Sequence, residues 1–334
     1  MIGMGNMDSF QKAAGGEDLS EEEAGQALRQ MIDGSMSQLK AAALLVALKM
    51  KGESEGEIAA FAKEMREQAV RIHPRIRQLV DTCGTGGDCK GTFNISTASA
   101  FIAAGAGVGI AKHGNRSVSS SCGSFDVLEQ LGVRALEPKD VERCIEKTGM
   151  GFMFAPFFHP AMKNIMPVRK ELGIRTIFNL LGPLTNPAGA QAQLIGVYDP
   201  RLTEKFASVL KRLGTGRALV VHSQGMDELG LGSSRVSELD DGEIRTYEIH
   251  GKDFGFEDRA IPVVKNREES AKIILGVLRG EKGSALDVCL LNAGAAIYVG
   301  GKAKTMEEGV GLARKAVLSG AAMKKLDMVR EFGG

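Results

Sequence analysis

The sequence predicts an α/β protein that combines a small helical domain with a large α/β domain built around a mostly parallel central sheet. Three observations support this prediction. Residues 20–73 have helical periodicity throughout, whereas the chain beyond them alternates short apolar strands with helices. In addition, 334 residues are too many for one simple core, which favours a large domain together with a smaller one.

Helix-start and helix-stop residues divide the N-terminal part into separate helices. Ser-x-x-Glu capping boxes begin at Ser20 and Ser54, Ser37 can cap a further helix between them, and Gly34 ends the first helix. The run 41–50 is apolar almost all round. We therefore expect this helix to be buried in a dimer interface as well as in the domain core.

The alternation of strands and helices begins after Pro74. The expected strands are 79–80, 108–111, 152–155, 194–197 and 218–221, and 236–239 with 244–249 has the pattern of a hairpin. The expected helices are 96–105, 124–131, 138–147 and 203–213, with further helices around 268–278, 285–298 and 305–319. Strands joined by helices are typical of βα units in a parallel sheet.

Two helical stretches, 159–172 and 175–181, interrupt this alternation. We expect them to pack with the N-terminal helices, which makes the helical domain discontinuous. The predicted boundaries are 17–74 with 159–185 for the helical domain, the expected dimer interface, and 75–158 with 186–334 for the α/β domain.

Composition and charge exclude several classes of protein. Apolar residues make up 43% of the chain, charged residues 25%, and the formal net charge is +1, so we expect neither a nucleic-acid nor a membrane partner. No apolar run is long enough to span a bilayer, and residues 1–16 lack the features of a signal peptide, so we expect a frayed tail there. The five cysteines are odd in number and form no CxxC pair, which indicates reducing cytosol without structural zinc.

A glycine-rich segment, 81–88, follows the first strand of the α/β part. Consecutive glycines let several backbone N–H groups converge on an anion, and α/β proteins bind ligands at the carboxyl ends of strands. A phosphate or pyrophosphate is the expected ligand, with a plain tight turn as the alternative. A dinucleotide fingerprint would need glycine where Cys89 stands, and a Walker loop would need lysine where Thr92 stands.

Polar and basic residues follow in two further segments. The short polar side chains of 94–97 lie at an expected helix start, where free N–H groups favour a phosphate, although ordinary N-capping is the alternative. Lys112 supplies a point charge, Asn115 an amide donor and the serines of 117–124 hydroxyl donors, unless this is merely a solvated loop. His113 is interpreted as a structural hydrogen-bonding group rather than a base.

An acidic pair and a single arginine complete the candidate site. Asp227 and Glu228 follow the strand 218–221, and adjacent carboxylates can each reach an oxygen-ligated Mg²⁺, although such pairs commonly lie on the surface. Arg169 carries a guanidinium that can bind a substrate carboxylate through two hydrogen bonds. A solvated helix face is the alternative for this arginine.

In combination, these segments resemble the anthranilate phosphoribosyltransferase family. The ordered motifs are Gly84-Thr-Gly-Gly-Asp88, Asn94-Ile-Ser-Thr97, Lys112-His-Gly-Asn-Arg116, Gly123-Ser124 with Asp126-Val-Leu-Glu129, Asn179-Leu-Leu-Gly-Pro-Leu-Thr-Asn-Pro187 and Asp227-Glu228. Each motif alone is weakly informative, but the ordered set is highly specific. The sequence departs from the family pattern at Ser121, Cys122 and Phe125.

The resemblance implies a role for each of these positions. The residues that look like contacts to phosphoribosyl pyrophosphate (PRPP) are Gly84, Gly87, Asp88, Thr92, Asn94, Ile95, Ser96, Thr97, Lys112, His113, Gly114, Asn115, Arg116, Ser117, Val118, Ser119, Ser120 and Ser124. Those that look like contacts to anthranilate are Gly84, Asn115 and Arg169, and those that look like Mg²⁺ ligands are Ser96, Asp227 and Glu228. Two Mg²⁺ ions are expected, and His113 is expected to position substrate without acting as an acid or base.

The implied reaction is transfer of the 5-phosphoribosyl group from PRPP to the amine of anthranilate, giving N-(5-phosphoribosyl)anthranilate and pyrophosphate in tryptophan biosynthesis. The family is similar in fold to the pyrimidine nucleoside phosphorylases and is usually a homodimer. One alternative is such a phosphorylase, which needs neither Arg169 and Asn115 nor the acidic pair. Another is a paralogue with a different acceptor or a nucleic-acid-binding role, which the near-zero net charge disfavours.

Overall fold

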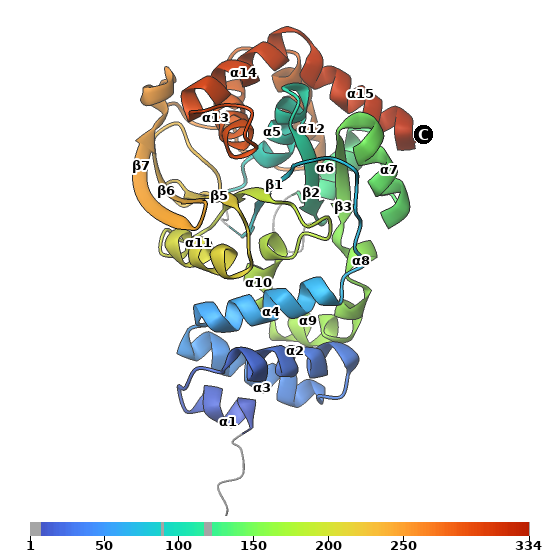
Figure 1. Cartoon of the computed structure of the whole chain (residues 1–334). Coiled ribbons are helices and arrows are strands. Elements are labelled where there is room, and N and C mark those ends of the chain that lie inside the picture. The colour runs from blue at the N-terminus through green and yellow to red at the C-terminus, as the bar shows by residue number, and fades with distance from the viewer. Residues whose placement is uncertain (1–7, 88–89, 117–121, 334) are drawn as a thin grey trace, which may run out of the picture. The chain divides into compact units, whose positions relative to one another are not determined.

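The computed structural model describes residues 8–87, 90–116 and 122–333. By its internal contacts the chain divides into two compact units. One comprises the chain up to Val70 together with His159–Thr185, and the other comprises Arg71–Phe158 together with the chain from Asn186 onward. In the described residues the first unit is entirely helical, and the second contains all the β-strands (Figure 1). The predicted class, a helical part plus an α/β part with a mostly parallel sheet, is confirmed.

The helical unit is assembled from both of its chain segments. Its helices are α1 (Ser9–Ala14), α2 (Glu21–Asp33), α3 (Gln38–Lys51), α4 (Glu55–Glu67), the 3₁₀ helix η1 (Pro160–Asn164), α9 (Met166–Leu172), α10 (Phe178–Leu181) and the 3₁₀ helix η2 (Gly182–Leu184). The predicted capping boxes at Ser20 and Ser54 are both present, and Ser37 caps α3. The side-chain amide of Asn164 donates to the carbonyl of Ile32, which ties the two segments together.

Two expectations for this unit are wrong. The sequence predicts a single helix over 159–172, but η1 ends at Asn164 and α9 begins anew at Met166. Pro167 has no N–H to bond back to a preceding turn, so it fits only near a helix start. The frayed tail expected over residues 1–16 is also wrong for 9–14, which form α1 with Ala13 buried.

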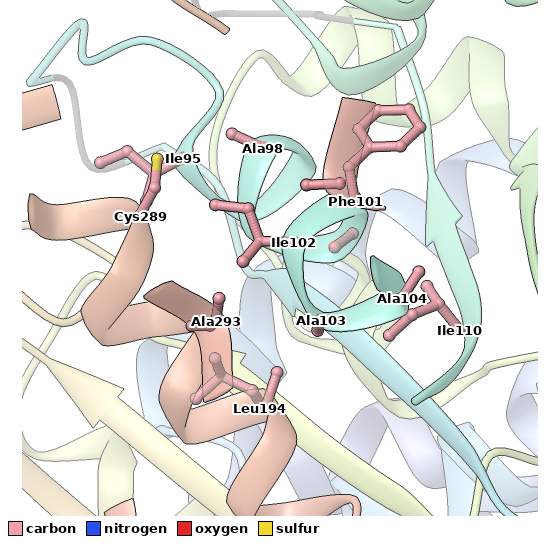
Figure 2. Close-up of a cluster of buried hydrophobic side chains, with 14 of the residues drawn as sticks. Ile95, Ala98, Phe101, Ile102, Ala103, Ala104, Ile110, Leu194, Cys289 and Ala293 are labelled. Carbon is pink, nitrogen blue, oxygen red and sulfur yellow. The ribbon is translucent and has the colours of Figure 1, made fainter. Parts of the chain in front are cut away.

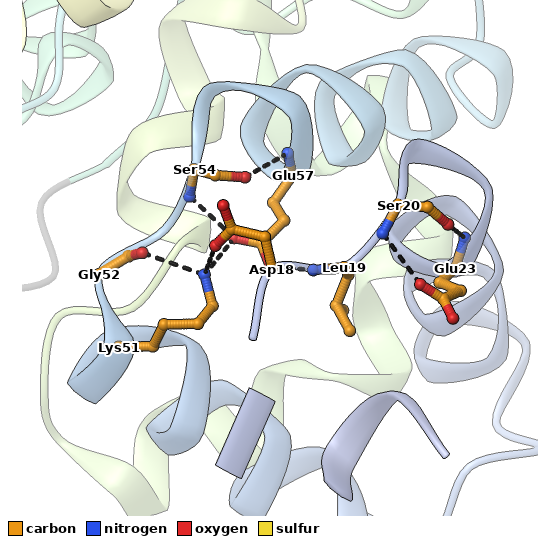
Figure 3. A network of polar contacts seen from close by, with 8 residues as sticks. All are labelled: Asp18, Leu19, Ser20, Glu23, Lys51, Gly52, Ser54 and Glu57. Carbon is orange, nitrogen blue, oxygen red and sulfur yellow. Dashed lines mark hydrogen bonds and ion pairs between the residues drawn. The ribbon is translucent and has the colours of Figure 1, made fainter. Parts of the chain in front are cut away.

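A buried glutamate, Glu57, accepts hydrogen bonds from three segments of this unit (Figure 3). The carboxylate of Glu57 accepts hydrogen bonds from the backbone N–H groups of Leu19 at 2.9 Å and Ser54 at 2.8 Å, and from the Lys51 ammonium at 2.8 Å. Lys51 also pairs with Asp18 at 2.6 Å. Burial lowers the pKa of Lys51, but the hydrogen bonds to both carboxylates outweigh that effect and raise it overall. The starts of α2 and α4 are thereby tied to the end of α3.

The second unit is built on one seven-stranded sheet of order β3-β2-β1-β4-β5-β6-β7. The strands are β1 (Leu79–Gly84), β2 (Gly109–Gly114), β3 (Met150–Phe154), β4 (Ala192–Gly196), β5 (Arg217–His222), β6 (Ser233–Asp240) and β7 (Glu243–His250). The first five strands pair in parallel, whereas β6 and β7 form the predicted antiparallel hairpin at one edge.

Helices cover the sheet and enclose the main core. They are α5 (Ile95–Gly105), α6 (Ser124–Gln130), α7 (Pro138–Thr148), α8 (Ala155–Phe158), α11 (Leu202–Arg212), the 3₁₀ helix η3 (Gly251–Phe254), α12 (Arg267–Leu278), α13 (Ser284–Val299), α14 (Met306–Leu318) and α15 (Ala321–Gly333). Helices α5 and α13 pack against each other and against the central strands, whereas α11 packs against β5 and β6. Figure 2 shows the apolar side chains of α5 and α13 meeting those of β2 and β4.

The sheet order places a topological switch between β1 and β4. The chain leaves β1 toward β2 on one side and leaves β4 toward β5 on the other, and ligands bind outside the carboxyl ends of strands at such a point. Strand β1 stays paired with β4 as far as Gly84 and Gly196, but its register with β2 ends at Val80 and Ile110. The strands β1 and β2 therefore part near the expected site. Across the described residues, no helix is both long and apolar enough to cross a bilayer.

Candidate active site

The glycine loop after β1 contacts the acidic pair that follows β5. The backbone N–H of Gly86 donates a hydrogen bond of 2.8 Å to Oδ2 of Asp227. A Cβ atom on Gly84 would lie 2.3 Å from the same Oδ2, and one on Gly196 would lie 1.4 Å from the carbonyl oxygen of Asp227. Glycine at the ends of β1 and β4 is thus what allows Asp227 to approach the loop.

The second carboxylate of the pair contacts the first turn of α5. The backbone N–H of Ser96 donates a hydrogen bond of 3.1 Å to Oε1 of Glu228. The ammonium of Lys112 donates to Oγ of Ser96 at 3.1 Å and to the carbonyl oxygen of Thr82. The glycine loop, the helix start, the basic segment and the acidic pair, which are separate along the sequence, are therefore adjacent in space.

Two buried charged side chains bridge β1 and β2 where these strands part. Asp81 is fully buried, and its Oδ1 accepts the backbone N–H of His113 at 3.1 Å while its Oδ2 accepts the Asn186 amide at 2.7 Å. Lys112, also buried, reaches back from β2 to the carbonyl of Thr82 on β1. Burial raises the pKa of Asp81, an effect that the charge of Lys112 opposes.

The turn after β2 is hydrogen-bonded to the start of α6, the helix that follows it in the chain. The carbonyl oxygen of Asn115 accepts hydrogen bonds from Oγ of Ser124 and from the backbone N–H of Phe125, both at 3.2 Å. A Cβ atom on Gly114 would lie 2.3 Å from Oγ of Ser124, so this turn and the start of α6 are in close contact. Phe125 itself is buried and packs on Phe154, with ring centroids 4.7 Å apart.

The other described positions of the predicted PRPP set differ in what they offer a ligand. The hydroxyl of Thr97 is fully buried and has no hydrogen-bond partner within the described part of the chain. The amide of Asn94 is bonded to the Cys122 carbonyl and to Ser270. The side chain of Ile95 is buried in the core, so only its backbone can contact a ligand.

Three further positions of the predicted PRPP set are Thr92, Gly87 and Arg116. Thr92 forms an isolated bridge with Val263, Gly87 has a left-handed φ of +76°, and the guanidinium of Arg116 pairs with Glu129. The predicted positions Asp88, Ser117, Val118, Ser119 and Ser120, and the departure at Ser121, lie outside the described residues.

Arg169 belongs to the helical unit, on α9. Its guanidinium lies over the ring of Phe178, 5.2 Å from the centroid, and donates to the sulfur of Met166 at 3.7 Å. No carboxylate of the described residues forms an ion pair with it. Burial lowers the pKa of this guanidinium. A partly buried cation that forms no ion pair among the described residues is suited to binding an anionic ligand.

The oxygen donors of the site suit Mg²⁺. Ser96, Asp227 and Glu228 provide one hydroxyl and two carboxylates, the hard ligands that this ion prefers. Among the described residues, no group of three or more His, Cys, Asp or Glu side chains could hold a metal alone. Mg²⁺ is commonly held by one or two carboxylates plus substrate phosphates, so the donor set fits a site that the ligand completes.

Sequence reasoning missed three polar residues that brace the site. Asp81 is a lone carboxylate in an otherwise apolar strand start, Asn186 lies within a motif whose role the sequence did not indicate, and Asn292 is a lone amide in the apolar helix α13. Such isolated polar residues are a usable signal, because buried polar groups require partners. Cys83 also adjoins the site, but burial raises the pKa of its thiol well above the ordinary value, which makes it a poor nucleophile.

Comparison with known proteins finds relatives that align with nearly the whole chain. The family described as "Glycosyl transferase family, a/b domain" matches residues 76–323, and its helical bundle domain matches residues 8–69. The anthranilate phosphoribosyltransferase of Methanocorpusculum labreanum is 51% identical over 325 residues, covering 96% of each chain. That of Polynucleobacter necessarius is 52% identical over 326 residues, again covering 96% of each chain.

Solved structures give the same result. The crystal structure of anthranilate phosphoribosyltransferase from Thermus thermophilus superposes with a TM-score of 0.93 at 47% identity, covering 98% of this chain and 99% of that one. The enzyme from Saccharomyces cerevisiae in complex with PRPP and Mg superposes with a TM-score of 0.88 at 26% identity, covering 97% and 96% of the two chains. The chain described here belongs to the anthranilate phosphoribosyltransferase family.

Proposed function

We propose that this chain transfers the 5-phosphoribosyl group of PRPP to the amine of anthranilate, giving N-(5-phosphoribosyl)anthranilate and pyrophosphate in tryptophan biosynthesis. The observation that supports the proposal most is the convergence of Asp227 on Gly86, Glu228 on Ser96 and Lys112 on Ser96. That arrangement gathers backbone N–H groups, an ammonium and two carboxylates at one end of the sheet. It suits a pyrophosphate ester accompanied by a divalent cation.

The reaction is a displacement at the anomeric carbon of the ribose. The bond between that carbon and the pyrophosphate oxygen breaks as a bond to the aryl nitrogen forms on the opposite face, through a cation-like sugar. The amine, now positively charged, then loses its proton to solvent. Lys112 and the N–H groups of the glycine loop lower the barrier by stabilising negative charge that accumulates on the departing pyrophosphate.

The proposed metal ligands are Ser96, Asp227 and Glu228, and two Mg²⁺ ions are expected. When bound, Mg²⁺ supplies positive charge that neutralises the leaving group. The Saccharomyces cerevisiae enzyme has been solved with PRPP and Mg, which supports Mg²⁺ as the metal. The proposed PRPP contacts are Gly84, Gly87, Thr92, Asn94, Ile95, Ser96, Thr97, Lys112, His113, Gly114, Asn115, Arg116 and Ser124, together with Asp88 and 117–120 outside the described residues.

The acceptor needs orientation more than it needs a base, because an arylamine is neutral at pH 7 and can attack before it loses a proton. We assign the anthranilate carboxylate to Arg169, whose guanidinium has no ion pair among the described residues, and the acceptor ring to the neighbourhood of Gly84 and Asn115. We assign His113 to positioning of the substrate. Its backbone N–H is fixed by a hydrogen bond to the carboxylate of Asp81. The Saccharomyces cerevisiae enzyme has been solved with 4-fluoroanthranilate, which supports an aromatic acceptor.

A fluorescence assay tests the proposal directly. Anthranilate, PRPP and Mg²⁺ are mixed with the protein, and the anthranilate signal should decay only when all three are present. The runner-up, a pyrimidine nucleoside phosphorylase, predicts instead the release of free base from thymidine or uridine in phosphate buffer. A steady anthranilate signal together with phosphorolysis would reverse the assignment.

We further propose that the protein is a homodimer formed through the helical unit, and that it works in the cytoplasm. Leu39 and Met50 on α3 are 83% and 81% exposed, and they share one face of that helix with the half-buried Val46. Large apolar side chains on one exposed face favour a second copy as the partner. Light scattering should give twice the chain mass for the wild type and a monomer for Leu39→Glu with Met50→Glu; an unaltered mass in that variant would exclude this face.

A further inference from the structure

Helix α13 contains one fully buried polar side chain that the reaction does not use directly. Asn292 is completely inaccessible to solvent, and its neighbours along α13, from Val288 to Val299, are buried apart from Tyr298. A buried amide that lacks partners costs free energy, so an amide in such a helix is expected to have a specific bonding role.

The partner of Asn292 is the backbone that carries the acidic pair. Oδ1 of Asn292 accepts the backbone N–H of Leu229 at 3.0 Å, and Nδ2 donates to the carbonyl oxygen of Leu229 at 2.9 Å. Nδ2 also donates to the carbonyl of Val288, one turn earlier in α13, at 2.9 Å. Both backbone groups of Leu229, the residue directly after Glu228, are therefore held by a single side chain, 63 residues away in sequence.

The same helix also packs against α5. The carbonyl oxygen of Cys289 accepts a hydrogen bond of 3.2 Å from the hydroxyl of Ser99, on α5. Figure 2 shows Cys289 of α13 beside Ile95 of α5, and the first turn of α5 carries Ser96. Cys289 and Asn292 are three residues apart, so one turn of α13 contacts both the Ser96 helix and the Glu228 loop.

We propose that Asn292 is a positioning residue for the metal-binding carboxylates, and that it fixes Glu228 against Ser96 by holding Leu229 to α13. This inference rests on the proposed function, because it assigns Mg²⁺ to Ser96, Asp227 and Glu228. Ligand geometry must hold within roughly 0.5 Å, and a segment whose two backbone groups lose their buried partners does not keep that tolerance. Outer-shell partners of metal ligands typically change metal affinity by about 10- to 100-fold when removed.

The test compares two buried hydrogen-bonding side chains that connect to the same helix. Asn292→Ala removes both hydrogen bonds to Leu229, whereas Ser99→Ala removes the contact to Cys289 and leaves Leu229 untouched. Binding is measured by titrating the Mn²⁺ complex of inorganic pyrophosphate into each protein, with circular dichroism confirming the fold. Asn292→Ala should raise the dissociation constant by about 10-fold or more, and Ser99→Ala by less than about twofold. Equal constants for folded Asn292→Ala and wild type would overturn the inference.

Two further measurements distinguish a failure of the positioning role from misfolding of the variant and from a failure of the proposed function. In the wild type, hydrogen exchange should show the Leu229 amide as protected as the middle of α13; rapid exchange there would overturn the inference even if Asn292→Ala does not fold. Asn292→Ala should also raise the Mg²⁺ concentration for half-maximal turnover while the KM for anthranilate stays within about twofold. If wild-type turnover does not depend on Mg²⁺, the proposed function fails first, and the positioning role fails with its metal.

Discussion

The carboxylate of Asp81 and the side-chain amide of Asn186 form a hydrogen bond of 2.7 Å in the interior of the α/β unit. The same amide donates to the carbonyl of Ala111 at 2.8 Å, and its oxygen accepts the N–H of Ala188 at 3.0 Å. Asn186 therefore connects β1 to β2 at the level where the two strands separate. Since Asp81 also accepts the N–H of His113, the pair determines where the basic segment leaves the sheet.

Asp81→Asn should destabilise the protein in a pH-dependent way. Asp81 accepts hydrogen bonds on both oxygens, from Asn186 and from the N–H of His113, whereas the new amide has a single oxygen and leaves one of these donors unsatisfied. An unsatisfied buried group costs about 1–3 kcal/mol. Burial raises the folded-state pKa of Asp81 above its ordinary value of 3.8, so the folded wild type binds its proton more tightly than the unfolded chain does. That contribution to stability is complete below pH 3.8 and is lost as pH rises through the folded-state pKa. Urea unfolding should therefore give a larger advantage of wild type over Asp81→Asn at about pH 4 than at about pH 7; a constant difference would contradict the prediction.

Replacement of Asp227 and Glu228 together by alanine should reduce kcat by at least about 100-fold, because the charge on the leaving pyrophosphate would lose its counter-charge. The fold should survive, since both side chains lie in a loop after β5 rather than in the core. A matched control removes two adjacent carboxylates elsewhere, by Glu21→Ala with Glu22→Ala on α2, where both are exposed. Comparable losses of kcat in the two double variants would show that net charge, not this site, matters.

Gly84→Ala should impair catalysis without unfolding the protein. The added Cβ would lie 2.3 Å from Oδ2 of Asp227, so the carboxylate must move away from the glycine loop. We expect kcat/KM to fall by about 10- to 100-fold with little change in Tm. The control is Gly311→Ala on α14, where an added Cβ meets nothing within 4 Å and should stabilise the helix by up to about 1 kcal/mol. Full activity of Gly84→Ala would mean that Asp227 tolerates displacement.

Arg169→Ala should raise the KM for anthranilate by at least about 10-fold and leave the KM for PRPP within about twofold, because a bidentate guanidinium–carboxylate contact is lost. Steady-state kinetics with each substrate varied in turn separates the two constants. Arg169→Lys should recover only part of the loss, since a point charge cannot make both hydrogen bonds. Lys170→Ala, at the exposed neighbouring position of α9, serves as the control. A parallel rise of both KM values would remove Arg169 from the acceptor site.

Local signals were sufficient for most of the fold. The capping boxes at Ser20 and Ser54, the hairpin around Asp240 and the alternation of strands with helices each depend on residues a few positions apart, and each appears in the structure as expected. The prediction is wrong after His159, where prolines divide the expected continuous helix into η1 and α9. The glycine loop, Lys112 and the acidic pair were also recognisable, because chemistry and order along the chain are properties of the sequence.

Which side chains hold those groups in place was decided only by the tertiary structure. Asp81 meets Asn186 across 105 residues and Leu229 meets Asn292 across 63, distances over which no periodicity or spacing rule applies. A lone polar residue in an apolar segment indicates that it needs a partner, but not which one. The partner is fixed when the strands and helices pack, because only then does burial remove water as the competing hydrogen-bond donor and acceptor.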